Sequence, residues 1–81
     1  MRKEKLIDKI VNVCFELRII KYSEYTKQVK NNFKIGIEDV AFVERLYNII
    51  FIKAKQRNII HTKKIKSLLV ELEKIRLDLE V

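Results

Sequence analysis

Hydrophobic residues recur along this chain at spacings of three and four, which is the period of an α-helix and not that of a strand. The first such stretch predicts a helix from Lys3 to Lys21. A shorter helix is predicted from Ser23 to Lys34, with Ser23 as its N-cap. Gly36 follows it and is expected to supply the left-handed residue that ends a helix. The row of the first helix comprises Leu6, Ile10, Val13, Leu17 and Ile20.

A third helix is predicted from Glu38 to Arg57, and it is apolar over most of its circumference. Such a helix needs neighbours on several sides, so we expect it to lie at the centre of the fold. Glu38 and Asp39 are expected in its first turn, where the helix dipole favours negative charge. A fourth helix follows Thr62, its predicted N-cap, and runs nearly to the C-terminus.

The fourth helix carries an apolar row with heptad spacing. Packing against the third helix and packing against a second copy of the chain would both satisfy this row. Apolar rows on three helices exceed what one small bundle comfortably covers, which predicts a homodimer. The predicted interface consists of Ile65, Leu68, Leu72, Ile75 and Leu79.

Composition supports an all-α fold in a single domain that spans residues 1–81. Apolar residues make up 48% and charged residues 36%, proline is absent, and glycine occurs once, which excludes collagen-like, linker-like and turn-rich all-β chains. We therefore predict a small bundle of three long helices and one short one. One cysteine and one histidine exclude a disulfide framework and a self-contained zinc site, so no metal or cofactor is expected. No apolar run is long enough to span a membrane, and a cytoplasmic protein without a membrane partner is expected.

The positive charge is concentrated at the turn between the third and fourth helices. The chain has 18 Lys and Arg against 11 Asp and Glu, a net charge of +7, and the segment 53–66 holds six of these cations and no acid. Three lysines stand in the first turn of the fourth helix, where each positive charge costs about 0.3–1 kcal/mol against the helix dipole. A bound anion would resolve this conflict. We call the cluster the basic corner; its residues are Lys53, Lys55, Arg57, His61, Lys63, Lys64 and Lys66.

A second basic stripe, Lys27, Lys30 and Lys34, follows one side of the second predicted helix. If it lay on the same side as the basic corner, the two could neutralise several phosphates together. The sequence therefore predicts non-enzymatic binding of DNA or RNA through the phosphate backbone, with low sequence specificity. The alternative is an adaptor or inhibitor that docks its basic pole on an acidic protein surface.

Catalytic chemistry finds no support in the sequence. His61 has no carboxylate three or four positions away on either side, and there is no glycine-rich phosphate loop. Cys14 borders the apolar face of the first helix and is expected to be a buried, inert thiol. We therefore expect that the protein is not an enzyme.

Overall fold

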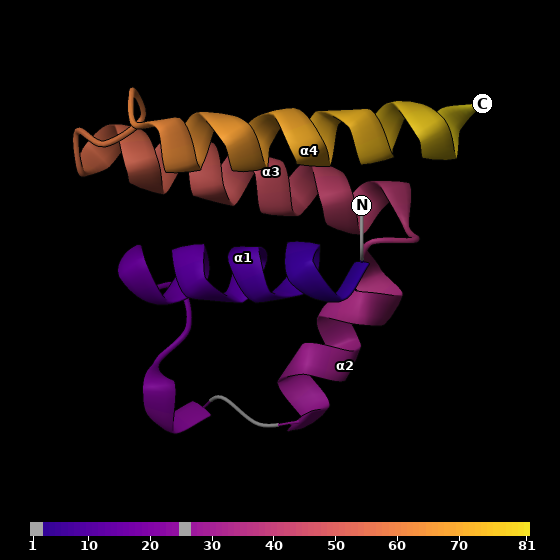
Figure 1. The fold of residues 1–81 in the computed structure, drawn as a ribbon, viewed down its shortest axis with the longest axis horizontal. Coiled ribbons are helices and arrows are strands. Elements are labelled where there is room, and N and C mark those ends of the chain that lie inside the picture. The colour runs from indigo at the N-terminus through magenta and orange to yellow at the C-terminus, as the bar shows by residue number, and fades with distance from the viewer. Residues whose placement is uncertain (1–2, 25–26) are drawn as a thin grey trace.

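The computed structural model describes residues 3–24 and 27–81, which form four α-helices and one 3-10 turn and contain no strand (Figure 1). The predicted all-α bundle of three longer helices and one shorter helix is thus confirmed. α3 and α4 form an antiparallel hairpin, and α1 and α2 both lie on one side of it. The elements are α1 (Lys3–Glu16), a 3-10 turn (Tyr22–Glu24), α2 (Lys27–Gly36), α3 (Val40–Gln56) and α4 (Lys63–Glu80).

The central helix is α1 and not α3, which corrects the sequence-based expectation. α1 lies between α2 and the α3–α4 hairpin, and its apolar positions on both sides are buried (Figure 1). α3 instead leaves Ile49, Phe51 and Ile52 partly exposed. Its extra apolar residues therefore do not enter the core, because neighbours cover only part of its circumference. The buried residues of α1 and the turn after it are Leu6, Ile7, Ile10, Val11, Val13, Cys14 and Leu17.

α1 ends at Glu16, five residues before the predicted end. Arg18 adopts a left-handed conformation with φ of 58°. The N–H of Ile19 donates to the carbonyl of Cys14 at 2.8 Å, and the N–H of Arg18 donates to that of Phe15 at 3.0 Å. This pair of bonds is a Schellman motif, which satisfies the last carbonyls of the helix and turns the chain away.

α3 ends by the same motif. Asn58 is left-handed with φ of 59°, and the N–H of Ile59 donates to the carbonyl of Ala54 at 2.9 Å. Asparagine tolerates this conformation better than most residues. At its other end α3 begins at Val40, so Asp39 is the N-cap and not a first-turn residue; its carboxylate accepts from the N–H of Ala41 at 3.1 Å.

The second predicted helix begins later than expected. Ser23 lies within the 3-10 turn and does not cap α2, which starts at Lys27. Residues 25 and 26 of that predicted helix lie outside the described residues.

Gly36 ends α2 as predicted, but the predicted reason is wrong. Its φ is not positive; the residue is helical and buried. A Cβ built on Gly36 would lie 2.6 Å from ring atoms of Phe42. Glycine is therefore needed here for close approach of α2 to a ring of α3, and not for a left-handed turn.

The heptad row of α4 packs inside the chain. Ile65, Leu68 and Leu72 are 1% exposed or less, in one core with α1 and α3. Ile75 and Leu79 are half-buried against the same core. The assignment of the three buried residues to an interface between copies is therefore corrected, because they offer no surface to a second chain.

Candidate nucleic-acid interface

The basic corner lies at one end of the molecule, where α3 ends, α4 begins and the C-terminal end of α1 lies alongside (Figure 1). Every one of its seven predicted residues is exposed. Lys53 and Lys55 belong to the last turn of α3, where positive charge is favourable. The antiparallel hairpin thus gathers cations from segments on both sides of one short loop.

The start of α4 has no side-chain cap. Thr62 has the extended backbone of an N-cap residue, but its hydroxyl donates to the carbonyl of Ile59 at 2.8 Å and accepts from no helix N–H. The first turn of α4 contains no acidic residue. Thr62 is therefore the predicted N-cap by position only, and the first N–H groups of α4 keep their partial positive charge beside the lysines.

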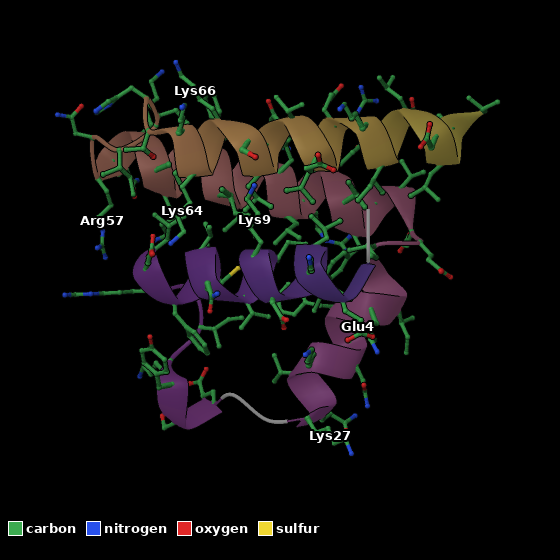
Figure 2. All side chains as sticks on the ribbon, in the orientation of Figure 1. Glu4, Lys9, Lys27, Arg57, Lys64 and Lys66 are labelled. Carbon is green, nitrogen blue, oxygen red and sulfur yellow. The ribbon has the colours of Figure 1, made fainter. Side chains whose placement is uncertain are left out.

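The three lysines of the first turn of α4, Lys63, Lys64 and Lys66, have different surroundings. Lys64 forms an ion pair with Glu16 of α1, and Figure 2 shows Lys64 directed toward α1 while Lys66 points to the other side of α4. Within residues 3–24 and 27–81, no carboxylate lies within ion-pair distance of Lys63 or Lys66. The sequence could not show this, because Glu16 lies 48 positions away.

Arg18 is a neighbour of the basic corner that the sequence did not reveal. The guanidinium of Arg57 lies 3.5 Å from the carbonyl oxygen of Glu16, so the ends of α1 and α3 are adjacent. Arg18 follows two residues after Glu16 and is exposed. The sequence would have revealed Arg18 only if it had shown that the first helix ends before it. Left-handed helix ends are usually marked by glycine or asparagine, and arginine gives no such signal.

The second basic stripe does not join the basic corner. Figure 2 shows Lys27 at the lower edge of the molecule, below α1, whereas Arg57 and Lys66 lie above α1. Two of the stripe's lysines are paired with acids of α1: Lys30 with Asp8 at 2.9 Å, and Lys34 with Glu4 at 2.5 Å. These pairs attach α2 to α1, which is a structural role for the stripe.

The two residues considered for catalysis have different surroundings. Cys14 is buried, and burial raises the pKa of its thiol to about 12, so the thiolate is scarce near neutral pH. His61 is exposed in the loop between α3 and α4. The imidazole therefore lies on the surface, whereas the thiol of Cys14 lies in the core.

Neither a family model, nor a curated protein, nor a solved structure matches this chain. Among the described residues, no helix combines the length and apolarity needed to cross a membrane. Function must therefore be inferred from the chain's own geometry and charge.

Proposed function

We propose that the protein binds nucleic acid through the phosphate backbone, and that the basic corner is the contact surface. The observation that carries the proposal is the convergence of cations from α3, α4 and the end of α1 at one exposed end of the molecule. Glu16 is the one acid that forms an ion pair with a residue of this corner in the described part of the chain. The residues proposed for phosphate contacts are Lys53, Arg57, His61, Lys63 and Lys66, with Arg18 beside them.

Two features favour a nucleic-acid backbone, with its row of phosphates, over a single small anion as the ligand. The cations belong to separate segments and spread over the end of the hairpin, so they match several charges in a row. The uncapped start of α4 adds backbone N–H donors and a positive dipole end at the same place. A chain of phosphates can contact both the spread cations and the uncapped start of α4. Each phosphate that is neutralised releases counterions, which favours binding.

Sequence preference is expected to be low. The exposed side of the corner consists mainly of lysines, which contact phosphates as point charges and carry little information about bases. The helices that form the corner also use their apolar sides for the core. Binding to duplexes of different sequence should therefore be similar.

The test is the salt dependence of binding to a mixed-sequence DNA duplex, measured by fluorescence anisotropy between about 50 and 200 mM salt. Replacing Lys53, Arg57 and Lys63 together by Gln should reduce the slope of log K against log salt by about three units. A matched control replaces three exposed lysines outside the corner, Lys5, Lys27 and Lys74, and removes the same charge. The control should change the slope by less than one unit.

Two outcomes would overturn the proposal. Equal losses in the two triple variants would mean that net charge, and not the basic corner, drives binding. Absence of binding to both DNA and RNA at the lowest salt would favour the alternative, an acidic protein surface as the partner of the same basic pole.

A further inference from the structure

Two stripes of side chains border the outer groove of the α3–α4 hairpin. Along α3 the stripe repeats at spacings of three and four, and along α4 the spacing is four, three, four and three. Residues at these spacings lie on one side of a helix. The stripe of α3 consists of Glu44, Tyr47, Phe51 and Lys55. The stripe of α4 consists of Lys66, Val70, Glu73, Leu77 and Glu80.

This groove faces away from α1. Ser67 marks the side of α4 that faces α1, because its hydroxyl accepts from the ammonium of Lys9 at 2.5 Å. Arg76 follows nine positions later, which is two and a half helical turns and therefore the opposite side. Arg76 and Glu73 line a groove of about 270 Å³ together with Glu44, Tyr47 and Asn48 of α3. Figure 1 shows α1 and α2 on the other side of the hairpin, so no described element covers this groove.

Exposed apolar side chains lie along both stripes, and in α4 they stand on either side of Glu73. The exposed fractions are 37% for Phe51, 52% for Val70 and 51% for Leu77. The ring of Tyr47 is stacked with that of Phe51, with centroids 6.3 Å apart and planes 9° from parallel. Apolar surface of this kind, flanked by charges, is typical of a face that associates with another protein.

Arg76 holds two carboxylates of α4 in place beside the groove. The guanidinium of Arg76 donates to Glu73 and, at 3.0 Å, to Glu80, and the hydrogen bond from Arg76 lowers the pKa of the Glu73 carboxyl. Side chains fixed in this way lose little freedom when a partner docks.

The charges at the two ends of the groove are opposite in sign. Lys55 and Lys66 lie at the end nearest the basic corner. Glu44, Glu73 and Glu80 lie toward the other end, where Arg76 pairs with Glu73 and Glu80 and still leaves the group net negative. A two-fold axis through the middle of the groove would set the basic end of one chain against the acidic end of another. It would also set Val70 of one chain near Leu77 of the other, on either side of Glu73, whose charge is paired with Arg76 of its own chain. We infer that this face docks a second copy of the chain, antiparallel, as a closed dimer of two hairpins.

Two-fold symmetry follows from the opposite charges at the two ends of the face. Each contact between the chains would then occur twice, and the face would be covered on both chains. The dimer would cover Phe51, Val70 and Leu77, which are exposed in the single chain. The surface is distinct from the heptad row, whose central residues are buried in the core. Lys66 belongs to both surfaces, whereas Lys53, Arg57 and Lys63 lie outside the two stripes and stay free for phosphates, so the inference does not depend on the proposed function.

The first test is the mass in solution by sedimentation equilibrium over micromolar to submillimolar concentrations at low salt. We expect the mass to level off at two chains. Leu77→Lys should weaken the dimer at least tenfold, because it would bury a charge among the apolar side chains of the interface. The control is Ile35→Lys, a change at a more exposed apolar residue, 72% exposed, on α2. It should leave the mass unchanged.

The second test exchanges charges between copies. Lys66→Glu and Glu80→Lys should each give monomers, since each would place like charges together across the two-fold axis. An equimolar mixture of the two variants should restore dimers, because opposite charges then meet at both contacts. Circular dichroism checks that each variant is folded.

Three results would overturn the inference. A single-chain mass at every concentration would exclude the dimer. Masses that exceed two chains would indicate an open, head-to-tail association instead of a two-fold one. Failure of the mixture to recover dimers would show that these charges do not meet. None of these results alters the expected salt dependence of DNA binding, so the two proposals fail separately.

Discussion

The contact between Gly36 and Phe42 gives the sharpest test of the fold. In most helices a glycine-to-alanine change is stabilising, by about 0.8–1 kcal/mol, since alanine loses less backbone freedom on folding. Gly36 has a helical, negative φ, so propensity alone predicts that Gly36→Ala stabilises the protein. The ring of Phe42 predicts the reverse.

The magnitude follows from the distance. A Cβ at Gly36 would lie 2.6 Å from three atoms of the Phe42 ring, well inside ordinary van der Waals contact. The ring is also fixed by an edge contact with Phe33, with centroids 5.8 Å apart, so it cannot move aside freely. Overpacking of this kind costs about 1–3 kcal/mol. After subtraction of the propensity gain, we expect a net loss of about 1 kcal/mol in the free energy of unfolding.

A double-mutant cycle measured by urea denaturation separates the two effects. In the background Phe42→Leu, the ring is absent and Gly36→Ala should become neutral or stabilising. The coupling energy between the two sites should be about 1–3 kcal/mol. A coupling below about 0.5 kcal/mol, the ordinary limit of additivity, would refute the role assigned to Gly36.

Three further predictions concern the end of α1. Arg18→Gly should raise the free energy of unfolding by about 1 kcal/mol in urea titrations, because glycine adopts the left-handed conformation without the penalty that arginine has; an unchanged midpoint would contradict this. Cys14, with its pKa raised to about 12 by burial, should react with a thiol reagent only as fast as the protein opens, so labelling that is fast and independent of urea would be inconsistent with the core. Glu16→Gln should release Lys64 and make the salt slope of DNA binding steeper by about one unit, with a loss of stability below about 1 kcal/mol because the pair is half-exposed. An unchanged slope would show that Lys64 does not reach phosphate.

The periodicity of the sequence predicted the helices well but not their ends. The apolar spacing of residues 3–21 continues past Glu16, and only the hydrogen bonds of Cys14 and Phe15 show that the chain turns at Arg18. Gly36 marked a true helix end, yet its role depends on a ring of α3 that only the folded chain brings near. Local patterns carry the element type, whereas the ends depend on tertiary contacts.

The candidate site was predictable in part, for a similar reason. The cations of the basic corner are close in sequence, so a short loop between antiparallel helices was enough to place them together. The pairing of Lys64 with Glu16, and of Lys34 with Glu4, joins residues far apart in the chain and has no local signal. Arg18 was missed because the predicted helix ran through it.

The enclosed position of α1 has a consequence for how the protein unfolds. Ile65, Leu68 and Leu72 of α4 share one core with the apolar side of α1, so loss of α1 would expose them to water at once. Among the described residues, the α3–α4 hairpin has no separate core that could keep it folded without α1. Unfolding should therefore be all-or-none, and a fragment that begins after α1 should aggregate or remain a loose helical ensemble.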